Sequence, residues 1–177
     1  MRRSILVAGI GNIFQGDDAF GVAVVQRLAA LPLPEHVRVM DIGIRAIDLA
    51  FALLNHHELT ILVDVTSRGD APGTLYTIEI EPGDIPDACD SASLVNAHGL
   101  DPVHVLSLAK SMGAPLTNIV LIGCEPEILD RDDTGHIGLS EVVEAAVSPA
   151  IQTIRQLISE FESNTSNEKE EVLHEYR

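Results

Sequence analysis

The sequence predicts an α/β fold: a single three-layer domain with a twisted, mostly parallel sheet of about five strands and helices on both faces. Short apolar segments alternate along the chain with segments of helical periodicity, and this alternation is typical of parallel sheets with helical crossovers. The chain has 177 residues, of which 46% are hydrophobic. It is therefore close to one domain in length and can bury a sizeable core.

Five segments have the composition of strands. The first is almost wholly apolar, as expected of a strand buried on both faces. The five are Ile5–Ile10, Val37–Ile42, Leu59–Val65, Leu75–Ile80 and Ile119–Gly123. A short turn containing Gly, Asp, Ala and Pro separates the third from the fourth. No helix fits there, so we expect these two strands to pair antiparallel at an edge of the sheet.

Four helices are expected between and after the strands, at 18–31, 46–54, 102–112 and 140–161. Ser140 suits the N-cap of the last helix, and Pro149 inside it predicts a kink or a break. Residues 1–161 should form the domain. The polar residues 162–177 have little to bury, so we expect a disordered tail there.

The charge and the cysteine content exclude several classes of protein. A formal net charge of -16 argues against a nucleic-acid-binding protein and against binding to an anionic membrane surface. No apolar stretch reaches the roughly 18–20 residues of a membrane helix. Two separated cysteines, Cys89 and Cys124, form no disulfide framework, and reduced thiols in a cytoplasmic protein are expected.

An acidic pair, Asp17 and Asp18, follows a turn that contains Gly9, Gly11 and Gly16. A phosphate-binding loop would place a lysine at this point and direct backbone N–H groups at an anion. Two carboxylates instead favour a site for a cation or for proton transfer. The same argument counts against a nucleotide- or phosphate-utilising enzyme.

Three polar residues should meet at the edge of the sheet where the parallel strands end, which is where open α/β sheets bind ligands. Asp18 follows the first strand, Asp64 lies near the end of the third, and His98 lies in the loop before the helix at 102–112. Two carboxylates and an imidazole form a three-ligand set for a divalent metal with open positions.

Each of these residues also has an ordinary structural explanation. Asp17 and Asp18 each suit a cap of the following helix, where the helix dipole favours anions. Asp64 suits a turn with Thr66 and Ser67, and a single loop histidine such as His98 is more often solvated than a ligand. Two further groups have weak signals. Cys124 has no base nearby in sequence to activate it, and the neighbouring His56 and His57 indicate a surface pair.

An ordered series of short motifs resembles the nickel–iron hydrogenase maturation proteases over about residues 4–160. No single motif is specific to this family, but the order of the motifs along the chain is. The series comprises Gly9-x-Gly11-Asn12-x-x-x-Gly16-Asp17-Asp18-x-x-Gly21, Asp41-x-Gly43, Asp64, Ala71-Pro-Gly-Thr74, His98 with Leu100, Gly123-Cys-Glu-Pro-Glu127 and Gly138-Leu-Ser140.

The resemblance implies an endopeptidase that removes a C-terminal extension from the precursor of a hydrogenase large subunit after nickel insertion. It also implies a mostly parallel sheet between helices and a monomer. By position, the metal-contacting and catalytic residues fall on Asp18, Asp64 and His98, and Asp41 and Gly43 help select the substrate. Nickel would belong to the substrate, so no tightly bound cofactor is expected in the free protein.

Three points remain open from the sequence. The general base is not assigned. Some members have threonine after the substrate-selecting glycine, whereas this chain has Ile44 and Arg45, so the hydrogenase subgroup is not defined. A non-catalytic nickel-sensing chaperone of the large subunit would use the same residues. Binding of the precursor without a change in its mass would distinguish that chaperone from a protease.

Overall fold

The computed structural model describes residues 4–87, 102–129 and 137–175, with side chains up to residue 164. His98, Cys89 and His136 lie outside the described residues. The elements in chain order are β1 (Ile5–Ile10), the 3-10 helix η1 (Asp17–Ala19), α1 (Phe20–Ala29), β2 (Val37–Gly43), α2 (Ala46–Leu53), β3 (Leu59–Val65), β4 (Leu75–Ile80), η2 (Pro82–Asp84), α4 (Pro102–Ser111), β5 (Ile119–Cys124) and α5 (Glu141–Glu175). Every expected strand is present, and every expected helix agrees within a few residues apart from the last, which is longer.

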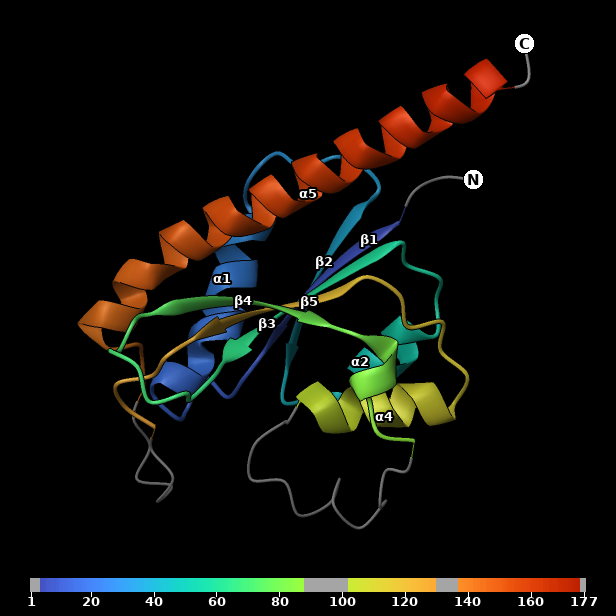
Figure 1. Cartoon of the computed structure of the whole chain (residues 1–177). Coiled ribbons are helices and arrows are strands. Elements are labelled where there is room, and N and C mark those ends of the chain that lie inside the picture. Colours follow the sequence, from blue (N-terminus) through green and yellow to red (C-terminus); the bar gives the residue numbers. More distant parts are fainter. Residues whose placement is uncertain (1–3, 88–101, 130–136, 176–177) are drawn as a thin grey trace.

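The five strands form one sheet in the order β2-β1-β3-β5-β4 (Figure 1). β2, β1, β3 and β5 run parallel, and β4 is an antiparallel strand at the edge. The predicted fold class is therefore confirmed. The expected pairing of the third strand with the fourth is wrong, because β4 pairs with β5, and β5 lies between β3 and β4.

The side chain of Glu125 explains how the connection between β3 and β4 passes β5. Glu125 directly follows β5 and is buried. Its carboxylate accepts hydrogen bonds from the backbone N–H groups of Arg68 and Gly69, at 2.7 and 3.1 Å, and from the hydroxyl of Tyr76 at 2.6 Å. The connection is thus held at the end of β5, one strand away from β3, and β4 returns along the outer side of β5.

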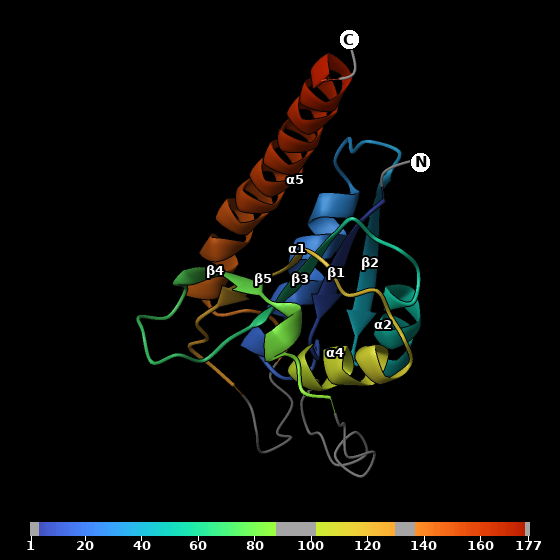
Figure 2. The ribbon, with the colours of Figure 1, turned by 45° about the vertical axis from the view of Figure 1, so that its right-hand side comes forward.

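Two apolar cores lie on the two faces of the sheet. β1, β3 and β5 alternate their side chains between these faces, as strands do. α1 and α5 pack on one face with Ile5, Val7, Ile61 and Val63. α2 and α4 pack on the other face with Leu6, Ala8 and Leu62. Figure 1 and Figure 2 show this three-layer arrangement, with α1 and α5 on the opposite side of the sheet from α2 and α4.

α5 begins as the sequence predicts and ends later. Ser140 is its N-cap: the hydroxyl oxygen accepts a hydrogen bond from the N–H of Val143 at 3.4 Å. Pro149 does not break the helix, which continues to Glu175 and projects beyond the sheet (Figure 1). The structure describes residues 162–175 as part of this helix, and the disorder expected for the tail stays a prediction. A helix that is already nucleated extends at little cost through residues of good helix propensity such as Glu and Lys.

His57 is buried rather than part of a surface pair, with 5% of its surface exposed. One ring nitrogen contacts the hydroxyl of Ser4 at 2.8 Å, and the other contacts the carbonyl oxygen of Ala52 at 3.1 Å. Burial lowers the pKa of the imidazole. His57 therefore joins the end of α2 to the start of β1.

Within the described residues, no helix is both long and apolar enough to cross a membrane.

α1 approaches the sheet so closely that the contact needs glycine. A Cβ atom on Gly21 would lie 2.2 Å from the carbonyl oxygen of Val63 and 2.3 Å from that of Ile10. Side-chain carbons essentially never come this close to backbone atoms. Gly9 meets Gly21 from β1, where an added Cβ would lie 2.2 Å from the Gly21 carbonyl oxygen. The paired glycines thus press the start of α1 against the ends of β1 and β3.

We expect Gly21→Ala to lower the free energy of unfolding by about 1–3 kcal/mol or more, because the methyl group forces α1 away from two backbone carbonyls. Chemical denaturation monitored by circular dichroism measures this. Gly83→Ala is the matched control, since nothing lies within 4 Å of a Cβ at that position. Equal stability of the two variants would show that α1 is not packed as described.

Candidate functional site

The two aspartates of the acidic pair have different environments. Asp17 is completely buried. Its carboxylate accepts hydrogen bonds from the N–H groups of Glu127 and Ile128, at 2.8 and 2.7 Å, and from the N–H and hydroxyl of Ser140, at 2.7 and 3.0 Å. Because every bond reaches residues more than a hundred positions away, Asp17 joins distant segments and has a structural role.

The interpretation that Asp17 caps the helix directly after it is wrong, because its carboxylate binds at the start of a different helix, α5. Neither η1 nor α1 has a side-chain hydrogen bond at its N-cap. Asp17 instead binds the N–H of Ser140, which precedes the first turn of α5, where a carboxylate also meets the positive end of the helix dipole. The backbone supports this contact, since the Asp17 N–H donates to the Ile128 carbonyl at 2.9 Å.

Asp18 lies at the end of the sheet, half-buried, in η1. One carboxylate oxygen accepts a hydrogen bond from the backbone N–H of Asn12 at 2.6 Å. Burial raises the pKa of this carboxyl group, and the hydrogen bond from Asn12 partly opposes that effect. Gly11 makes the position possible: its φ is +132°, and a Cβ there would lie 1.7 Å from the Asp18 carbonyl oxygen. Asp18 therefore carries a partly desolvated carboxyl group at the end of the sheet.

Asp64 is the second-last residue of β3 and is 6% exposed. One carboxylate oxygen accepts the N–H of Val65 at 2.8 Å. Leu62, two residues earlier, packs on the face of α2 and α4, so the period of the strand places the Asp64 side chain on that face as well. The neighbouring residue on β5 is Gly123, whose lack of a side chain leaves room for Thr66: a Cβ on Gly123 would lie 2.6 Å from the Thr66 hydroxyl oxygen.

Asp18 and Asp64 belong to the same end of the sheet, which we call the carboxyl edge: the edge at which β1, β2, β3 and β5 end. β1 and β3 are adjacent, with Gly9 opposite Val63, and the start of α1 packs against both strand ends. α4 packs on the same face as Asp64, and the segment that contains His98 leads into α4. His98 itself lies outside the described residues, so the three-residue set remains a prediction. Among the described residues, no three His, Cys, Asp or Glu side chains form a metal-binding group.

Asp41 and Gly43, the predicted substrate-selecting residues, lie at the carboxyl edge at the end of β2. The Gly43 carbonyl oxygen accepts a hydrogen bond from the Gly11 N–H at 3.1 Å, which joins the loop after β2 to the loop after β1. Asp41 is exposed, and its carboxylate accepts a hydrogen bond from Gln26 of α1 at 3.0 Å. The Asp41 carboxylate is therefore on the α1 side of the sheet, whereas Asp64 projects toward α2 and α4.

Glu125 and Cys124 are two further groups at this edge, at the end of β5. Sequence analysis did not single out Glu125, although a carboxylate directly after an apolar strand is the same signal that identified Asp64. Its hydrogen bond from Tyr76 is the main reason that its pKa is lowered, and burial raises the pKa of the Tyr76 hydroxyl. Burial raises the pKa of the Cys124 thiol to about 12, with Asp17 and Glu125 adding to the effect. Cys124 is therefore unsuited to act as a nucleophile.

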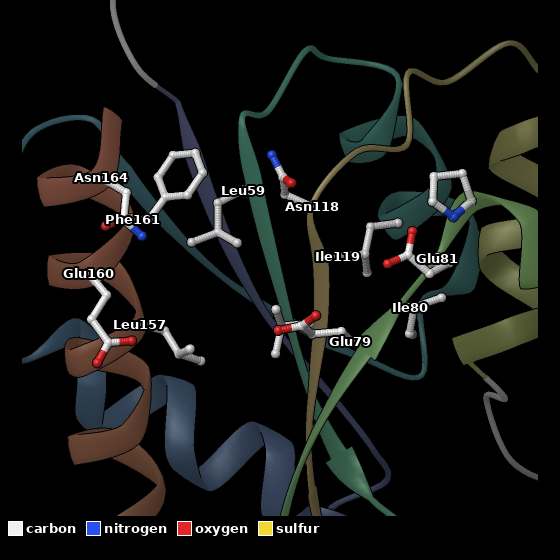
Figure 3. Close-up of a pocket in the computed structure, with 12 residues that line it drawn as sticks. Leu59, Glu79, Ile80, Glu81, Asn118, Ile119, Leu157, Glu160, Phe161 and Asn164 are labelled. Carbon is white, nitrogen blue, oxygen red and sulfur yellow. The ribbon is translucent and has the colours of Figure 1, made fainter. Parts of the chain in front are cut away.

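A groove on the molecule lies away from these residues. It runs between α5 and β4 and is lined by Glu79, Glu160 and Phe161 among others (Figure 3). Its floor includes Leu59 and Ile119, the first residues of β3 and β5, so it lies at the opposite edge of the sheet from Asp64. A groove at that edge holds none of the residues predicted to carry out the chemistry.

Comparison with known proteins identifies one family. Residues 22–157 match the model of the hydrogenase maturation protease family. The matched segment begins after Asp18 and includes Asp64 and His98. The chain is 32% identical over 157 residues to the hydrogenase 2 maturation protease of Escherichia coli K12, covering 88% of this chain and 91% of that protein. A putative hydrogenase maturation protease of Methanocaldococcus jannaschii is 30% identical over 154 residues, covering 86% and 95%.

Solved structures agree with this result. The hydrogenase maturating endopeptidase HybD from E. coli superposes with a TM-score of 0.68 at 30% identity, covering 89% of this chain and 93% of that one. A hydrogenase 2 maturation peptidase from a Thaumarchaeota archaeon gives a TM-score of 0.65 at 31% identity, covering 88% and 98%. The chain thus shares both sequence and fold with enzymes that cut proteins.

We predict that Asp17→Ala lowers the free energy of unfolding by about 3–5 kcal/mol, because it leaves several N–H groups without their hydrogen-bond partner. Guanidinium denaturation measures the loss. Asp84→Ala, a substitution of an exposed aspartate, should change stability by no more than about 0.5 kcal/mol. A tolerated Asp17→Ala would contradict the structural role of Asp17.

Asp18→Asn should stabilise the fold at neutral pH, because it removes a carboxylate that burial disfavours in its charged form. The raised pKa means that wild-type stability falls as the pH rises from about 3.8 through the folded-state pKa. The advantage of Asp18→Asn should therefore be largest at neutral pH and shrink as the pH approaches 4. Thermal unfolding across this pH range, with Asp84→Asn as control, provides the test, and a less stable Asp18→Asn at pH 7 would refute it.

Proposed function

The chain belongs to the hydrogenase maturation protease family, and on that basis we propose that it removes the C-terminal extension of a nickel–iron hydrogenase large-subunit precursor after nickel insertion. It is a protease, as its relatives are. The observation that supports the proposal best is the separation of roles within the acidic pair. Asp17 is fully engaged in structure, whereas Asp18 lies at the carboxyl edge beside the strand that carries Asp64.

In this proposal, nickel is part of the substrate and acts as the recognition element. Asp18, Asp64 and His98 would contact the nickel of the precursor and so place the scissile peptide bond at the carboxyl edge. Carboxylate and imidazole ligands suit a divalent nickel ion, and three such ligands form an incomplete set that the ligands of the substrate would complete. The free protein would hold nickel only weakly, as a sensor that must release its product requires.

Peptide hydrolysis needs a base that takes a proton from the attacking water and an acid that returns one to the leaving amine. Asp18 is less buried than Asp64, so water reaches its carboxylate more readily, and we assign Asp18 the role of the base. Asp64 is more deeply buried and already accepts the N–H of Val65, which suits a residue that holds its position. Asp41 and Gly43 would contact the precursor beside the site. We place the reaction in the cytoplasm and expect a monomer.

We expect the intact chain to shorten nickel-loaded precursor at its C-terminus, as measured by mass spectrometry, and to leave nickel-free precursor unchanged. Asp18→Ala, Asp64→Ala and His98→Ala should each reduce cleavage by at least about 10²-fold, since each removes a group that positions or activates the reactants. Asp84→Ala is the control and should retain activity.

Three outcomes would count against the proposal or a part of it. An unchanged precursor mass, under conditions where a known maturation protease cuts the same preparation, would exclude cleavage. Binding of the precursor without cleavage would instead indicate a nickel-sensing chaperone. Full activity of the Asp64→Ala variant would leave the endopeptidase function in place and refute the assignment of the site.

A further inference from the structure

Seven of the eight residues of α2 are apolar, although only one side of the helix is buried. Asp48 is its only polar residue. Leu49 and Leu53 pack into the core under the sheet, whereas Ile47 and Phe51 are 59% and 56% exposed. A helix that is apolar all round is typically covered on all sides. The exposed side of α2 is therefore a surface that lacks a partner within the described chain.

The exposed side chains form a stripe that starts beside the candidate site. Ile44, in the turn that leads into α2, is 66% exposed and directly follows Gly43 at the carboxyl edge. We call Ile44, Ile47 and Phe51 the α2 stripe. Ile47 and Phe51 are four residues apart and so share one face of the helix. The only charged side chain of α2, Asp48, is bound to Arg45 at 2.8 Å, so the two charges beside the stripe neutralise each other.

A second exposed apolar pair lies on the neighbouring loop. Ile13 and Phe14 follow β1 and are 47% and 59% exposed. The hydrogen bond between the Gly11 N–H and the Gly43 carbonyl joins their loop to the start of the α2 stripe. The same loop supplies the Asn12 N–H that binds Asp18. Two segments that are distant in sequence thus present large apolar side chains next to the proposed chemistry.

We propose that the α2 stripe docks an apolar face on the folded body of the hydrogenase precursor and thereby selects the protein whose C-terminus is cut. Exposed apolar clusters of this kind mark protein-binding surfaces. The stripe is adjacent to a site whose substrate is a protein, so a bound precursor must pass close to it. A second copy of this chain is a poor occupant, because two molecules with a net charge of -16 repel each other. This inference rests on the proposed function.

The test compares steady-state cleavage of nickel-loaded precursor by the full-length chain and by the double variant Ile47→Ser with Phe51→Ser. KM should rise about tenfold or more, a change of about 1.4 kcal/mol per factor of ten, while kcat at saturation stays within about twofold. Biolayer interferometry with the same precursor should show a matching loss of affinity. The matched control is Leu31→Ser with Met112→Ser, which replaces two exposed apolar residues at helix ends away from the carboxyl edge.

The outcomes separate the docking surface from the function. If the wild type cleaves and the stripe variant keeps its KM and affinity while folding normally, the docking surface is refuted and the protease function stands. If the control raises KM equally, the effect is not specific to the stripe, and the inference fails. A concentration-dependent dimer in analytical ultracentrifugation that the stripe variant abolishes, with KM unchanged, would assign the stripe to self-association. If the wild type neither cleaves nor binds the precursor, the proposed function fails and the docking inference with it.

Discussion

The carboxylate of Asp17 is the interaction on which the carboxyl edge of this protein depends. It gathers hydrogen bonds from the segment after β5 and from the start of α5, both far away in sequence. A backbone bridge between Gly16 and Leu129 runs alongside it. Because Asp17 is held in this way, the adjacent Asp18 has a defined position at the end of β1. The first aspartate therefore supports the geometry in which the second can act.

Close backbone contacts at two glycines fix the position of Asp18 and α1 relative to the sheet. Gly11 allows the backbone of Asp18 to rest against the end of β1, and Gly21 allows α1 to rest against β1 and β3. Asp18, in η1, and Asp64, at the end of β3, then lie at the same edge of the sheet, one in a desolvated position that raises its pKa and one almost fully buried. Keeping a carboxyl group in such a position costs stability. That cost is expected where a protein maintains a group for chemistry rather than for packing.

Sequence reasoning predicted the strands well because each is a short apolar run that the core requires, and it predicted the N-cap of α5 because Ser140 has a local signature. It was wrong where the contact that determines the structure joins residues far apart in the sequence. The pairing of β4 with β5 depends on Glu125, and the burial of His57 depends on Ser4, more than fifty residues away. The position of Asp64 near the edge followed from its place at a strand end. The structural role of Asp17 had no local signal, because all of its side-chain partners lie beyond residue 126.

The central claim is that Asp18, Asp64 and His98 together face a metal ion presented at the carboxyl edge. A crystal structure of the protein grown with Ni²⁺ tests it most directly, because anomalous scattering locates the ion without reference to activity. The account predicts a nickel ion contacted by a carboxylate oxygen of Asp18, a carboxylate oxygen of Asp64 and a ring nitrogen of His98. A nickel ion bound only elsewhere, with these three side chains directed to separate parts of the surface, would contradict it.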